Sequence, residues 1–235
     1  MSDTLRYNLP LLDAAQAQKH VTLNEALART DALASARVEN RALTVPPTAP
    51  QDGEAYIVAP GALGEWSGQD GDLALSLNGG WDFVTPWSGC TVWIEAERSH
   101  VVYDDGAWVA GRSGGGASGA ALLTRIAEID QPLSGPSTTT ALFIPDKAIV
   151  LGVTGRVIVA VSGATAWSLG VPGSTEQYGT GYGVDLNAFA HGVTGQPQAF
   201  YGGAALEITA EGGVFTAGEI RLAVHYLDIV PPSLV

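Results

Sequence analysis

Residues 71–81 read GDLALSLNGGW and predict a tight β-hairpin, the element that sets the fold class. The dipeptide Asn78-Gly79 follows an apolar run, and both residue types tolerate the positive φ of a type I′ turn. A tryptophan, Trp81, stands just past this turn. The stretch therefore indicates a short antiparallel hairpin with an aromatic side chain just past its turn.

Two neighbouring stretches repeat this arrangement in degenerate form. Residues 53–66 run from GEAYIV to Trp66, and residues 89–108 run from GCTVWI through Asp105-Gly106 to Trp108. Hairpins stacked on aromatic side chains predict a compact β domain of about 60 residues. Because the three tryptophans recur in register with the turns, we expect them to serve the fold rather than a ligand.

The segment before the hairpins, residues 11–38, is predicted to be helical. Thr22-Leu23-Asn24-Glu25 resembles a capping box, in which the Thr22 hydroxyl and the Glu25 carboxylate satisfy each other's backbone amides. Small or apolar residues then recur at helical spacing: Leu23, Leu27, Thr30, Leu33 and Ala34. This stripe either packs on its own domain or docks into a neighbouring subunit.

The C-terminal half predicts an antiparallel β-sandwich, jelly-roll-like in kind. Its apolar or alternating runs are joined by glycine-rich connections, and in the run Glu219–Leu227 the residues Ile220, Leu222 and Val224 share one face. Residues 172–198 have few strand signals and are expected to form exposed loops, which often carry function. The whole chain is thus expected to be mainly β. Its predicted parts are residues 1–112 (helix and hairpin repeats), a Gly/Ser-rich linker at 113–120, and the sandwich at 121–235.

Composition excludes several classes of partner. The 235-residue chain has 24 acidic and 11 basic side chains and a net charge of −13. Such a surface repels nucleic acids and anionic membranes. With Cys90 as the only cysteine, no intrachain disulfide can form. The polar start and the interrupted apolar stretch 148–171 predict neither a signal peptide nor a membrane span, hence synthesis in the cytoplasm.

No motif predicts a catalytic, metal or cofactor site. The histidines His20, His100, His191 and His225 are dispersed, without the spacing of a zinc site. Residues 111–115, GRSGG, have the letters of a nucleophile elbow but no helix behind them. Residues 179–183, GTGYG, lack the lysine of a phosphate-binding loop. We therefore expect a protein that is not an enzyme.

Paired carboxylates keep one enzymatic alternative open. The pairs are Asp70 with Asp72, Glu95 with Glu97, and Asp104 with Asp105. A glycosidase needs two carboxylates about 5–10 Å apart across a sugar-binding cleft. Glu95 and Glu97 are expected to lie on one face of a strand, so hydrolysis of a polysaccharide remains the alternative.

A carbohydrate site is predicted in the C-terminal half. Aromatic rings stack on sugar rings, and planar polar side chains bind sugar hydroxyls. Both kinds of side chain occur in or beside the glycine-rich segment 172–201. The candidate sugar-binding residues are Tyr178, Tyr182, Gln177, Asp185, Asn187 and Tyr201.

The sequence also resembles a known group of proteins. Residues 8–27, NLPLLDAAQAQKHVTLNEAL, followed by residues 50–108, resemble a domain of unknown function. That domain is common in tail-fibre and head-spike proteins of gene transfer agents and related alphaproteobacterial phages. The C-terminal half resembles these proteins through Ile144–Ala148, Trp167–Val171, Leu206–Gly213 and Ala223–Leu227.

The resemblance implies a function. The chain is expected to be a spike or fibre subunit on the surface of a phage-like particle, where it attaches to host capsular polysaccharide. Its other partners would be particle structural proteins and further copies of itself, with a trimer favoured. The group supplies no catalytic or binding residues and does not decide between head and tail. A capsule-degrading hydrolase and a connector without a receptor are the alternatives.

Overall fold

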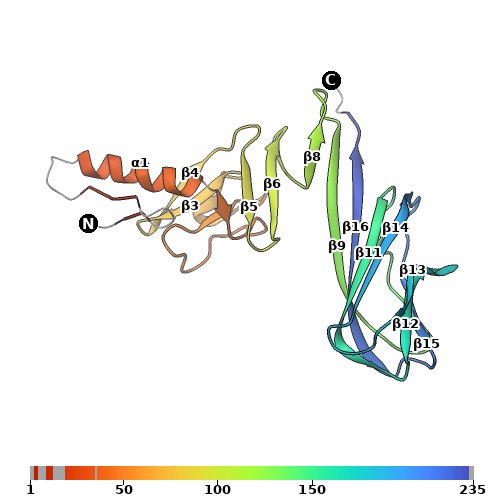
Figure 1. The fold of residues 1–235 in the computed structure, drawn as a ribbon. Coiled ribbons are helices and arrows are strands. Elements are labelled where there is room, and N and C mark those ends of the chain that lie inside the picture. Colours follow the sequence, from red (N-terminus) through yellow and green to blue (C-terminus); the bar gives the residue numbers. More distant parts are fainter. Residues whose placement is uncertain (1–2, 5–8, 13–18, 35, 233–235) are drawn as a thin grey trace. The chain divides into compact units, whose positions relative to one another are not determined.

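The computed structural model describes residues 3–4, 9–12, 19–34 and 36–232. The chain divides into two compact units, residues 1–111 and 112–235 (Figure 1). Both units are built mainly of strands, and the described residues contain a single α-helix. The predicted fold class, mainly β with an N-terminal helix, is confirmed.

The first unit combines the helix with two small sheets. Its elements are α1 (Lys19–Ala34), β1 (Arg37–Val38), β2 (Ala55–Ile57), a 3-10 helix (Gly64–Trp66), β3 (Leu73–Leu77), β4 (Gly80–Val84), β5 (Thr91–Ile94), β6 (Ser99–Asp104) and β7 (Ala107–Ala110). One sheet has the order β2-β3-β4 and the other the order β1-β5-β6-β7. All pairings are antiparallel except that of β1 with β5. The core contains buried side chains from both sheets together with Ala32 of α1.

Two of the three predicted hairpins form. Asn78 and Gly79 have φ values of 53° and 75°, and Asp105 and Gly106 have 49° and 78°. These are the positive angles of type I′ turns, and they join β3 to β4 and β6 to β7. The first repeat is not a hairpin, because β2 pairs with β3 across a long loop that contains the 3-10 helix.

The repeated tryptophans serve the fold, as expected. Trp66 is fully buried, and its ring lies 5.1 Å from that of Trp81 and 5.6 Å from that of Tyr56. Trp108 packs on Tyr103 at 5.2 Å, and its indole nitrogen donates a hydrogen bond to the Gly71 carbonyl. Such aromatic pairs stabilise a small domain by more than the burial of their apolar surface alone would.

The predicted helix was too long at its C-terminal end. Residues 13–18 of the predicted helix lie outside the described residues. At the other end, α1 stops at Ala34. Arg37–Val38 form an edge strand instead, and the Val38 side chain packs in the core. Thr22 lies inside the helix, so it cannot be the N-terminal cap that the sequence suggested.

The predicted apolar stripe is also not the packing face of the helix. Leu23 is 46% exposed, whereas Asp31 and Ala32 are buried. The buried Asp31 is tolerated because its carboxylate accepts a hydrogen bond from the Thr4 hydroxyl at 2.9 Å. Of the stripe, Leu33 packs against the core.

The second unit contains two antiparallel sheets, consistent with the predicted β-sandwich. Its strands are β8 (Arg112–Gly115), β9 (Ala121–Pro132), β10 (Ser137–Thr139), β11 (Ile149–Ser162), β12 (Ala166–Val171), β13 (Ser174–Tyr182), β14 (Phe189–Ala199), β15 (Glu207–Glu211) and β16 (Ala217–Val230). The sheet orders are β14-β11-β16-β9-β8 and β10-β15-β12-β13. Figure 1 shows β9, β11 and β16 as long neighbouring strands.

The core of the second unit lies between these two sheets. Val153 and Val157 on β11 and Leu222 on β16 face Trp167 and Leu169 on β12, all of them fully buried. Ile220, Leu222 and Val224 share one buried face, as the alternation in the sequence predicted. The Trp167 indole donates a hydrogen bond to the Gly183 carbonyl at 2.8 Å, which satisfies its only polar group.

Two expectations for the second unit need correction. The predicted linker includes Ser113, Gly114 and Gly115, yet these residues lie in β8, where Gly114 and Gly115 pair with residues of β9. Residues 172–198 are not a set of loops, because most of them form β13 and β14. Whether the two units fold independently stays a prediction.

Candidate functional site

The six predicted sugar-binding residues do not form one site. Tyr178 is only 2% exposed and belongs to the core of the second unit. It is buried because it lies on the inward-facing side of a strand, not on an open loop. Its assignment as an exposed ligand contact was wrong.

Tyr182 is also committed to packing. Its ring lies 4.9 Å from that of the buried Trp167, and its hydroxyl donates a hydrogen bond to the Tyr178 carbonyl. Burial raises the pKa of its phenol. Tyr178 thus belongs to the core of the second unit, and Tyr182 packs against it.

The other four candidates lie at opposite ends of β14. Asp185 and Asn187 occupy the turn before the strand, whereas Tyr201 follows it and is 82% exposed. Gln177 donates a hydrogen bond to Gln198 near the strand's C-terminal end. A strand rises about 3.3 Å per residue, so the ends of an 11-residue strand are about 33 Å apart. These residues cannot contact one sugar together.

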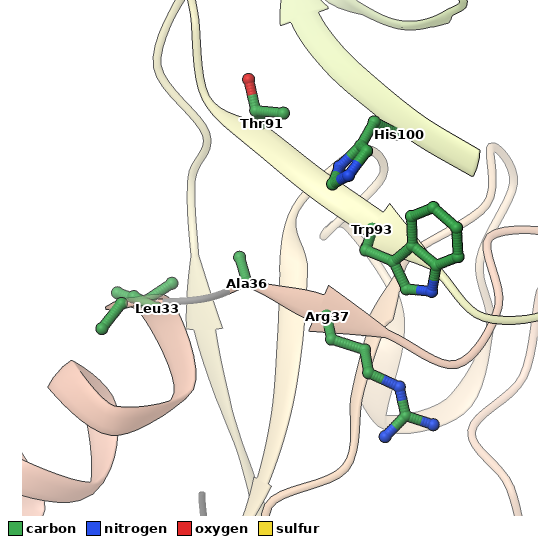
Figure 2. A pocket seen from close by; sticks show the side chains of 7 residues that line it. Leu33, Ala36, Arg37, Thr91, Trp93 and His100 are labelled. Atoms are coloured by element: carbon green, nitrogen blue, oxygen red, sulfur yellow. The ribbon is translucent and has the colours of Figure 1, made fainter. Parts of the chain in front are cut away.

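The first unit, in contrast, holds a pocket on the outer face of its four-stranded sheet (Figure 2). Arg37 on β1 is opposite Trp93 on β5, and Trp93 is opposite His100 on β6. Residues directly opposite each other point to the same face of a sheet. The intervening residues Val38 and Ile94 point to the core.

The pocket lies where this sheet face meets the C-terminal end of α1. Its volume is about 590 Å³, and its lining residues are Leu33, Ala34, Ala36, Arg37, Thr91, Trp93 and His100. Figure 2 shows Trp93 and His100 side by side on adjacent strands, with Ala36 and Leu33 at the other side of the pocket. We call this feature the Trp93 pocket.

The Trp93 ring is held in place before any ligand arrives. Its indole nitrogen donates a hydrogen bond of 2.9 Å to Oε2 of Glu95. The His100 ring meets it edge to face, with centroids 4.9 Å apart and planes at 67°. A ring that is fixed in this way loses little conformational entropy when a ligand stacks on it.

A small charge network surrounds the ring. Arg37 Nε lies 3.2 Å from Glu95 Oε2, and a terminal nitrogen of Arg37 lies 3.2 Å from Glu39. The hydrogen bond from Trp93 and then the Arg37 guanidinium lower the pKa of the Glu95 carboxyl. The ionised form of Glu95 is therefore favoured.

The carboxylates are not arranged as a hydrolase pair. Glu95 and Glu97 lie in the turn after β5, not on a strand face as expected, and Glu97 makes a bidentate ion pair with Arg41. A general acid needs a raised pKa, whereas those of Glu95 and Asp70 are lowered, the latter by the backbone amides of Gly61 and Ala62. Within the described part of the chain, no three His, Cys, Asp or Glu side chains could hold a metal ion together.

Trp93 and Glu95 stand two residues apart in the sequence, but no motif predicts that they form one site. The signal was present as alternation, because Thr91, Trp93 and Glu95 alternate with the apolar Val92 and Ile94. What the sequence could not show is the parallel pairing of β1, which brings Arg37 beside Trp93.

All residues of the Trp93 pocket fall within one segment that is similar to known sequences. Residues 23–109 match DUF2793, a family described as proteins of unknown function. The expected match to a domain of unknown function is thereby confirmed for this segment. A search of curated proteins found no match.

Two solved structures show a distant likeness to part of the chain. A chain of the cyanophage Pam1 capsid asymmetric unit is 21% identical, with 55% of this chain and 97% of that chain covered and a TM-score of 0.37. A chain from Bacillus endospore appendages, which form a family of disulfide-linked pili, is 15% identical, with 48% and 95% covered and a TM-score of 0.23. At these TM-scores neither likeness supports an argument about function. The resemblance to spikes of gene transfer agents stays a prediction.

Among the residues that the structure describes, no helix is long and apolar enough to cross a bilayer.

Proposed function

We propose that this chain is a non-enzymatic surface subunit of a phage-like particle that attaches to cell-surface polysaccharide through the Trp93 pocket. The observation that carries the proposal is the fixed indole ring on an open sheet face, bordered by the ionised Glu95 and by Arg37. Sugar sites combine an aromatic platform with such planar polar groups. The particle location rests on the resemblance described above.

The proposed ligand is a neutral polysaccharide. The chain carries a net charge of −13, so an acidic polymer would be repelled at long range. Each sugar contact is expected to be weak, because stacking on one ring contributes on the order of 1 kcal/mol. Several copies on one particle would act together, since linked sites bind at a high effective concentration.

The decisive experiment measures binding of purified capsular polysaccharide to two tryptophan variants. Trp93→Ala should weaken binding about tenfold, which corresponds to about 1.4 kcal/mol. Trp87→Ala is the matched control, because Trp87 is 58% exposed in the same unit but lies outside the pocket. Equal binding by both variants would remove the pocket from the proposal.

The length of the polysaccharide after incubation with the protein, together with its binding, distinguishes adhesion from the two alternatives. Binding with no shortening of the polymer supports adhesion. Shortening by wild-type protein supports a depolymerase, and an absence of binding to any capsule supports a connector without a receptor.

A further inference from the structure

One tight turn of the first unit contains a dipeptide that can react with itself. Asn78-Gly79 forms the two-residue turn between β3 and β4, and both residues are exposed. Of the five asparagines in the chain, only Asn78 is followed by glycine. In such a pair the glycine amide nitrogen can attack the carboxamide carbon of the asparagine, because glycine has no Cβ atom to hinder the approach. The two reacting groups belong to neighbouring residues, so no enzyme is needed to bring them together.

The surroundings of the turn leave this approach open. A Cβ atom at Gly79 would have nothing within 4 Å. The Asn78 carboxamide makes no hydrogen bond with any other residue that the structure describes. In contrast, the Asn24 carboxamide bonds both backbone groups of Leu12, and the Asn40 carboxamide accepts a hydrogen bond from a nearby backbone amide. The Asn78 side chain is therefore free to rotate towards the Gly79 amide.

A carboxylate lies beside the amide that would attack. The Gly79 amide donates a hydrogen bond to Oδ1 of Asp52, with 3.3 Å between the nitrogen and the oxygen. Asp52 is held beside the turn because the following amide, that of Gly53, donates a hydrogen bond of 2.7 Å to the Ser76 carbonyl on β3. A carboxylate in this position can accept the amide proton while the new bond forms, as a general base does.

We propose that Asn78 is a site of spontaneous deamidation and that Asp52 assists the reaction as proton acceptor. The Gly79 nitrogen forms a bond to Cγ of Asn78, and its proton passes to the Asp52 carboxylate. The bond between Cγ and the carboxamide nitrogen then breaks. Asp52 returns the proton to the leaving nitrogen, which departs as ammonia. Residues 78 and 79 are left joined in a five-membered succinimide ring.

Water opens this ring in two ways. Hydrolysis of the bond between the Gly79 nitrogen and the former carboxamide carbon leaves aspartate at position 78 with an ordinary main chain. Hydrolysis of the bond between that nitrogen and the backbone carbonyl carbon leaves isoaspartate, whose main chain runs through an additional methylene group. Each product adds one negative charge to a chain that already carries −13.

The two products differ in how well they suit the turn. Aspartate is compatible, because Asp105-Gly106 forms the same kind of turn with φ values of 49° and 78°, close to the 53° and 75° of Asn78-Gly79. Isoaspartate is not, because its longer main chain does not fit a two-residue turn between the paired residues Leu77 and Gly80. Ageing therefore gives one product that keeps the hairpin and one that loosens it. This chemistry is independent of the Trp93 pocket.

Peptide mapping by mass spectrometry tests the proposal on the full-length protein, kept folded for several weeks at neutral pH and physiological temperature. The peptide that contains residue 78 should gain the small mass that replacement of NH₂ by OH adds. Part of the product should be isoaspartate, which direct hydrolysis of the carboxamide does not form. Asn24 and Asn40 are internal controls and should stay unchanged, because their carboxamides are hydrogen-bonded and their next residues have side chains.

Two substitutions in the neighbouring loop test the role of Asp52. Asp52→Ala should slow the reaction about tenfold, which is less than the 10²–10⁴ of a well-placed general base because the hydrogen bond exceeds about 3.2 Å. Alanine is chosen because asparagine at position 52 would create a second Asn-Gly pair with Gly53. Gln51→Ala is the matched control, since it changes the adjacent exposed residue and should leave the rate unchanged.

Both substituted residues are exposed, so the fold should survive, and melting curves check that it does. A folded wild-type protein in which residue 78 stays unchanged would overturn the proposal. So would deamidation of Asn24 or Asn40 at a similar rate, or an equal or faster reaction in Asp52→Ala.

Discussion

Gly192 on β14 lies directly against Tyr178 on β13. A Cβ atom at Gly192 would be 2.3 Å from the Tyr178 carbonyl oxygen and 2.5 Å from its Cβ atom. No side chain fits in this space, so the two strands can approach so closely only with glycine at this position. The contact holds β13 against β14 within residues 172–198, the segment expected from the sequence to form loops.

Gly192→Ala should therefore destabilise the protein. The added methyl group overpacks a buried site against backbone atoms, which typically costs about 1–3 kcal/mol. Gly195→Ala, on the same strand, is the control because nothing lies within 4 Å of the corresponding Cβ position. Urea unfolding should show a lower midpoint for the first variant only. A similar midpoint for both would contradict the close approach.

Loss of the hydroxyl should destabilise the protein at Tyr182 but not at Tyr178, the two tyrosines of β13. Burial raises the pKa of Tyr178 to about 12, and its hydroxyl finds no hydrogen-bond partner among the described residues. Tyr178→Phe removes an unsatisfied buried group and should be neutral or stabilising by about 1 kcal/mol. Tyr182→Phe loses a hydrogen bond to the Tyr178 carbonyl and should cost about 1 kcal/mol. Thermal unfolding measures both, and a clear loss of stability in Tyr178→Phe would contradict this account.

The sequence was sufficient where local chemistry decides the structure. Asn78-Gly79 and Asp105-Gly106 specify their turns without help from the rest of the chain, and the run Glu219–Leu227 alternates strongly enough to reveal its buried face. It was insufficient for β13 and β14, whose buried positions include Tyr178, Ala190 and Gly192. Strands with so few apolar residues are defined by their neighbours and not by their own pattern.

The candidate site shows the same limit. Exposed aromatic residues were expected where glycines are frequent, but glycine at positions 179 and 192 allows close packing on Tyr182 and Tyr178. The Trp93 pocket depends on a two-residue strand that pairs in parallel with a segment more than 50 residues away. Such a non-local pairing leaves no periodic signal in the sequence.

The Glu95 carboxyl should titrate below its ordinary value of 4.5. The hydrogen bond from Trp93 is the largest cause, and the hydrogen bond and positive charge of Arg37 add to it. Because the folded-state pKa is lowered, ionised Glu95 stabilises the fold above pH 4.5, and this contribution is lost as the pH falls through the lowered pKa. Carboxyl chemical shifts in NMR titrations should give a midpoint below 4.5. Trp93→Phe and Arg37→Gln should each raise that midpoint, and an unchanged midpoint in either variant would contradict the assignment.

The last prediction concerns the start of the second unit. Arg112 pairs with Leu123, and Gly115 pairs with Ala121, so β8 satisfies the edge of β9 that would otherwise be open. A fragment of residues 112–235 should therefore fold alone and should be more stable than one of residues 121–235, by about 2 kcal/mol for the few hydrogen bonds lost. Limited proteolysis of the whole chain should cut in the exposed turn around residues 116–119, which the strand pairing leaves unprotected. Calorimetry of both fragments measures the difference. Equal melting temperatures would mean that β8 contributes nothing to the sheet. An unfolded fragment 112–235 would mean that the second unit depends on the first, because every strand of its two sheets is present in that fragment.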